Sequence, residues 1–395
     1  MAKKMLFLVV LLFSLTGMLK AQVTTAGMSG KVMADEESVI GATVVAVHEP
    51  SGTSYGTVTN VDGRFSLQGM RSGGPYKVTV SYIGYQTAIY TGIQLQLGET
   101  YSLNVTLHEV SELLGEITIT ASKSKFSAEK TGATTNISSE QLTTLPSINR
   151  SISDFTRISP YASGNSFGGR DGRSNTFTVD GANMNNNFGL SSDLPGGGNP
   201  ISLDAIDEVQ VVIAPYDVRQ ANFIGAGINA ITKSGTNAYR GSAYMYFNNE
   251  VMRGNKIGDT DFGARAEESK TVYGATLGGP IIKDKLFFFA NVEYEKSPQQ
   301  VITWRAAREG EDPNNSTISR TTEADLAEFS QILKDKYGYN TGSFTDFPAD
   351  VTNLKLLGRI DWNINQGNKL SVRYNFTNNK TWNAPNGSSG NTGYR

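Results

Sequence analysis

Two short motifs near residue 125 contain the residue types of a covalent acyl-transfer site. Ser122 and Lys125 fit the pattern S-x-x-K, and Lys130 begins a K-T-G sequence; both are elements of the serine acyl transferases that react with penicillin. In those enzymes the serine begins a helix, K-T-G lies on a distant strand, and S-D-N completes the site. The chain contains no S-D-N, and its two motifs are nearly adjacent. We therefore predict that this segment performs no covalent chemistry.

The composition argues against most other catalytic and metal sites. Cysteine is absent, which excludes disulfides within the chain, thiolate zinc sites, iron–sulfur clusters and cysteine nucleophiles. With only two histidines, His48 and His108, a metal site would need mostly carboxylate or carbonyl oxygens. No motif supplies a nucleophile, a base and an orienting group together. The sequence predicts a protein that is not an enzyme and holds no cofactor or metal.

The first 21 residues have the three parts of a secretory signal peptide. Lys3 and Lys4 precede an apolar run from Met5 to Leu19, and a small residue, Ala21, stands before Gln22. The alternative is a membrane anchor, but a spanning helix needs about 20 apolar residues and this run is shorter. We expect cleavage between Ala21 and Gln22.

Charge does not favour a nucleic acid as a partner. The formal net charge is -2, with 35 basic and 37 acidic residues. Removing the leader also removes Lys3, Lys4 and Lys20, which leaves 32 basic against 37 acidic residues and a net charge of about -5. A slightly acidic chain has no electrostatic surface for a phosphate backbone.

Short alternating runs separated by turn residues predict a small antiparallel β-sandwich over residues 22–110. Four motifs lie in order along this stretch: G-K-V from Gly30, G-A-T-V from Gly41, D-G-R-F from Asp62 and S-Y-I-G-Y from Ser81. With these motifs the stretch resembles the carboxypeptidase-regulatory-like, transthyretin-like sandwich. The resemblance implies a scaffold or docking domain, because that domain is not a peptidase.

An alternating strand at residues 116–121 precedes a polar linker within residues 111–125. A strand with a free backbone edge can join the sheet of another protein, and it can equally be the last strand of the preceding sandwich. Its residues are Glu116, Ile117, Thr118, Ile119, Thr120 and Ala121.

Residues 126–235 predict a mixed α+β domain with short capped helices at 138–142 and 152–158 and strands at 176–181 and 206–213. Its G-G-R-D-G from Gly168, V-D-G from Val179, I-D-E-V-Q-V from Ile206 and G-A-G-I-N-A-I-T-K-S-G from Gly225 resemble the plug domain of TonB-dependent outer-membrane receptors. P-Y-D-V-R-Q from Pro215 resembles the Oar-like subgroup. The R-G-P that usually follows the third motif in the family is missing, since Ile213, Ala214 and Pro215 stand there, which weakens any transfer of siderophore or cobalamin specificity.

The resemblance implies roles for several residues. Residues 116–121 become the TonB box, on which the inner-membrane TonB protein pulls. Gly225 and Gly227 are read as close backbone approaches near the passage from plug to barrel, with an ordinary turn as the alternative. Six polar residues are expected to face the substrate at the plug apex, although the ordinary polarity of a solvated loop explains them equally well. They are Arg170, Asp171, Arg173, Asn185, Asn186 and Asn187.

In residues 236–395 apolar residues alternate with polar or charged ones with a strict period of two. This pattern predicts the first strands of a membrane barrel with a polar interior; a soluble sandwich is the alternative. On residues 354–365, Ile360 and Trp362 lie on an apolar face opposite Arg359 and Asp361. We expect five strands, at 239–248, 271–277, 286–295, 354–365 and 369–378, with a helix at 323–336. All three tryptophans, Trp304, Trp362 and Trp382, lie in this part, as aromatic girdles would require.

If the first strand starts in the periplasm, an odd number of strands predicts that the fifth ends outside the cell. The chain is therefore expected to be an N-terminal fragment with roughly five of the 22 strands that the resemblance implies. A barrel with an open edge leaves backbone groups unsatisfied in lipid. The fold expected is therefore mainly β: a transthyretin-like sandwich, an α+β plug and an incomplete transmembrane barrel.

The function expected from the resemblance is TonB-driven uptake of an unidentified external substrate across the outer membrane. The alternative is a surface adhesin of the same architecture that binds without transport. Its partners would be TonB, outer-membrane lipid and the substrate, with the sandwich in the periplasm.

Overall fold

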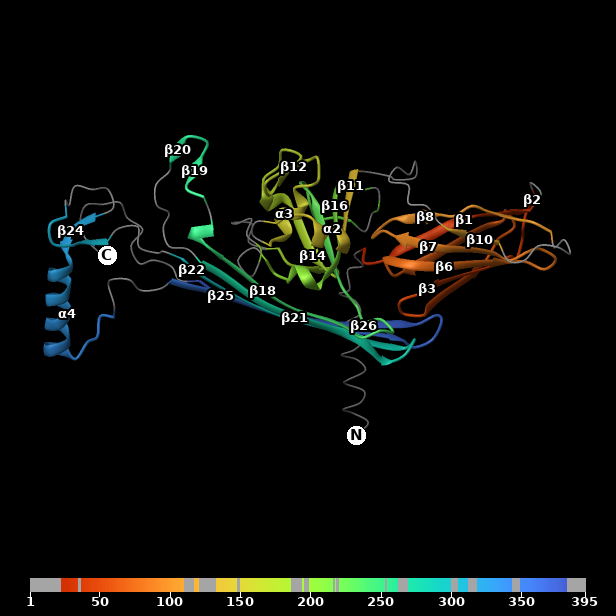
Figure 1. The fold of residues 1–395 in the computed structure, drawn as a ribbon. Helices are drawn as coiled ribbons and strands as arrows, with labels where there is room; N and C mark the ends of the chain where they lie inside the picture. The colour runs from red at the N-terminus through yellow and green to blue at the C-terminus, as the bar shows by residue number, and fades with distance from the viewer. Residues whose placement is uncertain are drawn as a thin grey trace, which may run out of the picture. The chain divides into compact units, whose positions relative to one another are not determined.

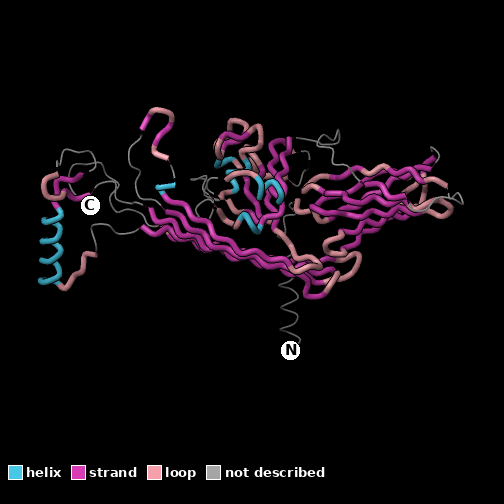
Figure 2. The backbone as a smooth tube through the Cα atoms, viewed as in Figure 1, coloured by secondary structure: helices cyan, strands magenta, loops and turns pink. Residues whose placement is uncertain are grey.

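The computed structural model describes residues 23–34, 37–109, 117–120, 133–147, 150–185, 194, 199–215, 217, 220–252, 254–261, 269–299, 305–311, 318–342 and 349–381. The described chain is mainly β, as expected, with a few short helices (Figure 2). None of its helices has the length and apolarity needed to cross a bilayer. The chain divides into two compact units, residues 1–241 with 276–291 and 357–375, and residues 242–275 with 292–356 and 376–395.

The N-terminal domain of the first unit is a sandwich of two sheets (Figure 1). One sheet contains β1 (Ala26–Ala34), β2 (Glu37–Ser38), β5 (Arg64–Met70), β8 (Thr100–Ser102) and β9 (Val105–Leu107). The other has the order β10-β7-β6-β3-β4, with β3 (Thr43–His48), β4 (Thr53–Val58), β6 (Gly73–Ser81), β7 (Ala88–Leu95) and β10 (Ile117–Thr120).

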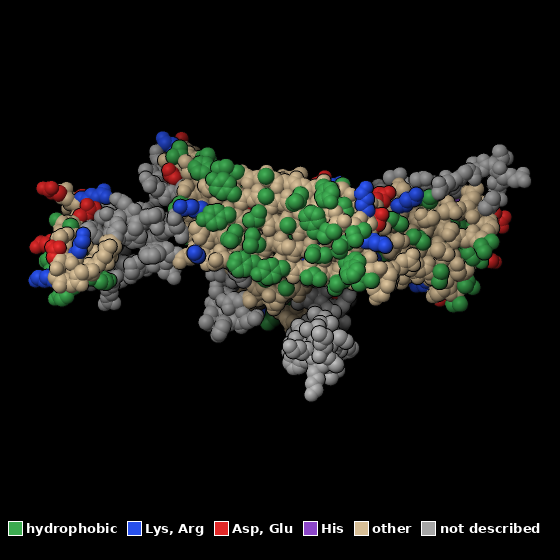
Figure 3. Space-filling view, turned by 90° about the horizontal axis from the view of Figure 1, so that it is seen from below, with side chains coloured by type: hydrophobic (Ala, Val, Ile, Leu, Met, Phe, Trp, Pro, Cys, Tyr) green, Lys and Arg blue, Asp and Glu red, His purple; other side chains and the backbone are tan. Residues whose placement is uncertain are grey.

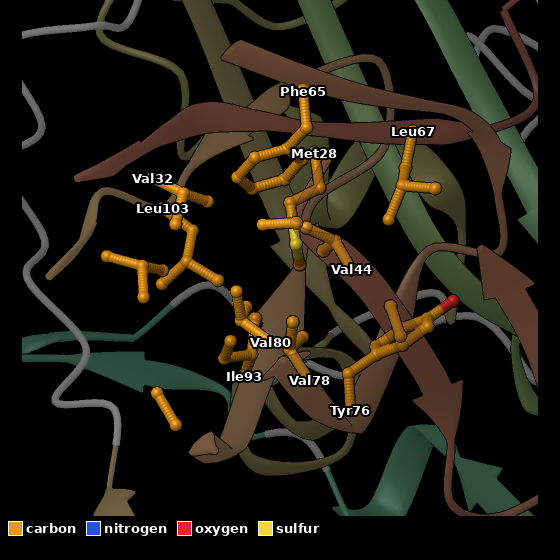
Figure 4. Packing of buried hydrophobic residues seen from close by; sticks show 14 of the residues in the cluster. Met28, Val32, Val44, Phe65, Leu67, Tyr76, Val78, Val80, Ile93 and Leu103 are labelled. Atoms are coloured by element: carbon orange, nitrogen blue, oxygen red, sulfur yellow. The ribbon is translucent and has the colours of Figure 1, made fainter. Parts of the chain in front are cut away.

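The core of this sandwich is made by alternate residues of both sheets. Val44 on β3 and Val78 on β6 are fully buried, and they share a cluster with Met28 and Phe65 from the opposite sheet (Figure 4). The residues that alternate with Val44 along β3 and with Val78 along β6 are partly buried or exposed. This is the pattern of a sheet with one face on a core. At roughly 25 cal/mol per Å² of buried apolar surface, this alternation is the main stabilising contribution of the domain.

The middle domain, residues 133–232, also belongs to the first unit. Its sheet has the order β11-β16-β17-β14-β15, with β11 (Ala133–Ser138), β14 (Thr176–Val179), β15 (Ala182–Asn183), β16 (Ile206–Ala214) and β17 (Gly227–Thr232). The expected helices are α2 (Ser139–Thr144) and α3 (Ile152–Thr156). A capping box between Ser138 and Gln141 fixes the start of α2. Strand β11 is not expected from its sequence, A-T-T-N-I-S, which has little apolar alternation; pairing with β16 creates it.

The remaining long strands form one sheet in the order β18-β21-β22-β25-β26. They are β18 (Arg240–Asn249), β21 (Ser269–Ile282), β22 (Leu286–Gln299), β25 (Ala349–Asn363) and β26 (Lys369–Lys380). The five expected strands are present, but the end of the second was wrong. Residues 278–282 continue β21 instead of forming a connection, so only residues 283–285 join it to β22.

The second unit contains the expected helix, α4 (Glu323–Tyr337), beside the short strands β23 (Arg305–Ala307) and β24 (Ile318–Thr322). Thr322 caps the helix N-terminus in a capping box with Asp325, and Gly338 ends the helix in the left-handed conformation. Both capping signals are local to the sequence of the helix.

The long strands bury their charged side chains and expose their apolar ones. On β25, Lys355, Arg359 and Asp361 are 3%, 8% and 5% exposed. Their apolar neighbours Ile360 and Trp362 are 46% and 44% exposed. The face of the molecule seen in Figure 3 accordingly carries many hydrophobic side chains and few charged ones over the long strands.

Candidate functional site

The strand β10 lies on the edge of the second sandwich sheet. Residues Ile117 to Thr120 pair in parallel with Ala88 to Thr91 of β7, in the register Ile117 to Ala88. Glu116 and Ala121, the ends of the segment expected to be a TonB box, lie outside the described residues. The structure thus gives this segment the position of a last sandwich strand, and its backbone pairing is made within the chain.

Two residues after β7 ends, the backbone of Leu97 is held by three side chains of the middle domain, a contact we call the Leu97 clasp. The Leu97 amide donates to both carboxylate oxygens of Glu208, each at 3.1 Å. The Leu97 carbonyl accepts from Gln210 Nε2 at 2.5 Å and from Asn136 Nδ2 at 3.2 Å. Leu97 itself is fully buried. Both backbone polar groups of a buried residue are therefore satisfied by the neighbouring domain.

Gly98 allows the clasp to form. Its φ is +70°, which disfavours any side chain, and a Cβ there would lie 2.8 Å from Gln210 Nε2. A second bond joins the same two domains, from Asn229 Nδ2 to the Val23 carbonyl.

The electrostatics of the clasp are set by burial. Burial raises the pKa of the Glu208 carboxyl to about 8, and the nearby Asp207 also raises it, while the Leu97 amide and Asn136 act in the opposite direction. A protonated Glu208 is therefore favoured in the folded protein over a wide range of pH.

A second polar network joins the middle domain to the long strands. Thr232, at the end of β17, donates from its hydroxyl to Asp180 Oδ2 at 2.6 Å and from its amide to Asp180 Oδ1 at 3.0 Å. Arg359 on β25 donates to the Thr232 carbonyl. The same guanidinium pairs with Asp361 at 2.8 Å.

The network continues into the sandwich and into the last described strand. Arg71 of the sandwich lies 3.3 Å from Asp361 Oδ2, and Ser371 on β26 donates to Asp361 Oδ1 at 2.6 Å. Arg373 on β26 lies 3.4 Å from Asp180. Within the first unit, charged side chains thus link all three of its parts.

Sequence reasoning missed the clasp and this network. Glu208 and Gln210 are polar residues inside an otherwise apolar strand, and that alternation was the available signal for a buried polar contact. Nothing local to Leu97 or Asn136 indicates that they meet, because they are brought together by folding.

The residues expected to face a substrate are largely occupied by local contacts. Asp171 Oδ1 accepts from the amide and from Nε of Arg173, both at 2.9 Å, and caps a short 3-10 helix, Gly172–Ser174. Asn185 accepts from the Phe177 amide at 2.6 Å. Arg170 is exposed. Asn186 and Asn187 lie outside the described residues, as do Ala21 and Gln22.

Gly225 shows the close backbone approach that was expected of it. A Cβ at this position would lie 2.3 Å from Asn175 Oδ1, the atom that accepts from the Ala226 amide. At Gly227 a Cβ would meet the Phe223 ring at 2.7 Å.

Of the two histidines in the sandwich, His48 has a structural role. Burial, and the neighbouring charge of Arg71, lower the pKa of His48 to about 3, and its Nδ1 lies 2.7 Å from Ser51 Oγ. Over the described ranges, no three His, Cys, Asp or Glu side chains are grouped as metal ligands would be.

Comparisons with known proteins agree with this architecture. Residues 27–108 match the carboxypeptidase regulatory-like domain, and residues 231–395 match an outer membrane beta barrel domain. The chain is 25% identical to the TonB-dependent transporter Oar of Myxococcus xanthus over 339 residues, which are 81% of this chain and 30% of that protein. The chain therefore spans under a third of the length of this curated relative.

Similar solved structures include the siderophore receptor PirA from Acinetobacter baumannii, at 19% identity and a TM-score of 0.42 over 66% of this chain and 33% of that one. The outer membrane transporter YddB from Escherichia coli is 15% identical with a TM-score of 0.41, over 62% of this chain and 33% of that one. The relatives are named as transporters and receptors and not as enzymes. In its two domain matches, which follow one another along the chain, and in its Oar relative, the chain is similar to the TonB-dependent receptors of the outer membrane.

Proposed function

We propose that this chain is the N-terminal part of a TonB-dependent transporter that takes up an external substrate across the outer membrane. In this proposal the middle domain is the plug, the long strands are the first strands of the barrel, and residues 116–121 are the TonB box. Substrate identity is left open among sugars, peptides and metal chelates, because the polar residues at 170–173 and Asn185 discriminate none of them.

The observation that carries the proposal is the inverted polarity of the long strands. In water, a sheet that exposes Ile360 and Trp362 while burying Lys355 and Arg359 would be unfavourable, because it exposes apolar surface and desolvates charge. In a membrane barrel the outer face contacts lipid and the inner face contacts the plug or water. Phe289 and Leu357, which point to the inner face, pack in the core of the middle domain.

Contacts between the sandwich and the ends of the long strands support a sandwich on the periplasmic side of the barrel. Asn237, just before β18, donates from its amide to the Pro50 carbonyl of the sandwich at 2.8 Å. Asn363, at the end of β25, donates to Thr53 Oγ1 at 3.0 Å. The strand ends joined by short turns are thus on the side of the sandwich, and short turns belong to the periplasmic side of such barrels.

The lipid-facing assignment is tested with single cysteines, since the chain has none of its own. Spin labels at Val292→Cys and Asn291→Cys, which are adjacent on β22, are compared in the full-length protein in phospholipid vesicles. Val292 is 43% exposed and Asn291 is 5% exposed. We expect the label at 292 to be accessible to oxygen dissolved in lipid and the label at 291 to be shielded from it. Equal lipid accessibility of the two labels would contradict the barrel.

The energy-coupling assignment is tested by deleting residues 116–121 in the full-length protein. Uptake should be lost while surface binding of the same molecule persists. A control deletion of the four polar linker residues 122–125 should leave uptake in place. Unchanged uptake without residues 116–121 would refute the TonB box, and binding with no uptake in the unaltered protein would favour an adhesin.

A further inference from the structure

We infer that the sandwich is a clamp that fastens the plug to the barrel from the periplasmic side, and that its attachment to the barrel opens in each uptake cycle. The inference rests on the proposed function for the identity of the plug and the barrel and for uptake itself. It gives the sandwich a function of its own in transport.

The first argument is the turn between β3 and β4, residues 48–53, which we call the barrel latch. His48 Nδ1 lies 2.7 Å from Ser51 Oγ, which lies 2.8 Å from Thr53 Oγ1. Thr53 Oγ1 in turn accepts from Asn363 Nδ2, at the end of β25, at 3.0 Å. The three side chains of the turn are buried. A chain of buried hydrogen bonds in the sandwich therefore ends on a side chain of the long-strand sheet.

This chain of hydrogen bonds has one consistent direction. Asn363 Nδ2 also donates to the Asp284 carbonyl at 3.1 Å, which fixes the orientation of its amide. An amide nitrogen only donates, so Thr53 accepts from Asn363 and its hydroxyl is free to donate to Ser51. Ser51 can then donate to His48 Nδ1, because burial lowers the pKa of His48 to about 3 and the ring is neutral. His48 therefore holds the Thr53 oxygen ready to accept from the barrel.

Two further contacts on the same side reach other long strands. The Asn237 amide, just before β18, donates to the Pro50 carbonyl of the latch at 2.8 Å. Lys369 Nζ, at the start of β26, lies 3.1 Å from the centroid of the Tyr55 ring on β4, a cation–π contact. Strands β18 and β26 are the two outer strands of the long-strand sheet. The latch region thus holds this sheet at several strands.

The second argument is that the same sandwich is also fixed to the plug. The Leu97 clasp joins it to Glu208 and Gln210 on β16 and to Asn136 on β11. The latch and the clasp belong to one sandwich with a continuous core. A plug that moves relative to the barrel therefore cannot keep both attachments, and one of them has to open.

The third argument is burial, which differs between the two attachments. Leu97 and Glu208 are buried, whereas Lys369 is exposed and Asn237 and Asn363 are partly exposed. Opening the clasp would bring a buried leucine into water, while the barrel partners of the latch already contact water. Water therefore replaces the latch contacts at a smaller free-energy cost. The latch is the attachment that opens, and the sandwich moves with the plug.

Thiol labelling tests the inference without knowledge of the substrate. Single variants Thr53→Cys, Leu97→Cys and Val58→Cys are made in the full-length protein, and the chain has no cysteine of its own. Residue 53 reports on the latch, residue 97 on the clasp, and residue 58, which is 61% exposed, on the free surface of the sandwich. Growing cells are treated with a small charged methanethiosulfonate reagent, which enters the periplasm through porins, with and without a protonophore.

Without the protonophore, Thr53→Cys should react at least about tenfold faster than with it, because the rate follows the fraction of molecules whose latch is open. Leu97→Cys should stay protected in both states, since the clasp binds the backbone of residue 97 and survives the substitution. Val58→Cys should react at the same rate in both states.

A disulfide across the latch gives a second measurement of opposite sign. A Cβ on residue 52 would lie 2.9 Å from Asp284 Cγ. The Cβ atoms of Gly52→Cys and Asp284→Cys are therefore within reach of the roughly 3.5–4.5 Å separation of a disulfide. During a short pulse of oxidant this pair should crosslink more completely with the protonophore, when the latch is closed. The control pair Thr43→Cys with Val58→Cys joins Cα partners of β3 and β4 and should crosslink equally in both states.

Equal protection of residue 53 in both states would overturn the inference. Labelling of residue 97 in place of residue 53 would overturn it as well, because the clasp would then be the attachment that opens. Failure of the latch pair to crosslink in either state, while the control pair does, would show that the sandwich does not rest on the barrel. The proposed function is judged separately, by uptake after deletion of residues 116–121. Protection of residue 53 in a protein that needs those residues for uptake would count against the clamp alone.

Discussion

The sandwich and the long-strand sheet use the same two-residue alternation with opposite polarity. In the sandwich, Val78 and Val80 are fully buried, and Lys77, which lies between the fully buried Tyr76 and Val78, is exposed. On β25, Arg359 and Asp361 are buried and Ile360 is exposed. The period of a strand therefore identifies two faces but not which face meets the core. The surroundings decide that: water for the sandwich and, in the proposed barrel, lipid for the outer face of the long strands.

The largest expected effect comes from removing one partner of a buried ion pair on the inner face. Lys355 Nζ lies 2.9 Å from Glu293 Oε1, and the two side chains are 3% and 5% exposed. Lys355→Met leaves a buried carboxylate without its ammonium partner, which should cost about 3–5 kcal/mol of unfolding free energy. Urea unfolding in vesicles measures it. The double variant Lys355→Met with Glu293→Gln should recover much of the loss, and no recovery would contradict a specific pair.

The second effect places a charge on the outer face. Ile360→Arg should destabilise the protein in vesicles by about 2–4 kcal/mol if residue 360 lies near the bilayer midplane, and by less near an interface. The matched control is Val58→Arg in the sandwich, where residue 58 is 61% exposed and should change stability by no more than about 0.5 kcal/mol. Similar small effects at both positions would remove the contrast between the two regions.

The third prediction concerns the pH dependence of the Leu97 clasp. The folded-state pKa of Glu208, about 8, lies above its ordinary value of 4.5, so the fold favours the protonated form. This contribution is complete below about pH 4.5 and is lost as the pH rises through about 8. The contact should therefore weaken between pH 5 and pH 9 by at least about 1 kcal/mol, the equivalent of less than one pKa unit.

Hydrogen exchange of the peptide containing Leu97, corrected for the intrinsic rate at each pH, measures this change. Glu208→Gln keeps an oxygen acceptor without the charge, so its protection should be nearly independent of pH. A peptide from the sandwich core around Val78 serves as an internal reference. The same pH dependence in Glu208→Gln would assign the effect to another group.

The smallest effect separates backbone strain from close approach. Gly69 and Gly98 both have a φ near +70°, but a Cβ at Gly69 would meet nothing within 4 Å, while one at Gly98 would meet Gln210. Gly69→Ala should cost about 1 kcal/mol from strain alone. Gly98→Ala should cost about 1 kcal/mol more, because the Gln210 amide must give up a bond to Leu97. Thermal unfolding compares the two, and equal losses would mean that the clasp contributes no stability.

Much of the fold was predictable because its signals are local. The alternation of residues 354–365 located β25 and its two faces, and the helix expected at 323–336 is α4, whose capping box and terminal glycine lie within its own sequence. Strand β11 was missed, and the end of β21 was placed too early, because both depend on pairing partners elsewhere in the chain. Glycines and a proline in residues 278–280 indicate a turn locally, but the neighbouring strands hold them in the sheet.

The sequence by itself determined the order of the parts: a sandwich, an α+β domain and long alternating strands, together with the residue type at each face. Only the tertiary structure decided which distant residues meet. Leu97 contacts Glu208, which is 111 positions away in the chain. Arg71 contacts Asp361, which is 290 positions away, from 71 to 361. The pairing of residues 117–120 with β7 is of the same kind. Local periodicity is encoded within about ten residues, whereas such contacts depend on loop closure and on packing of whole domains.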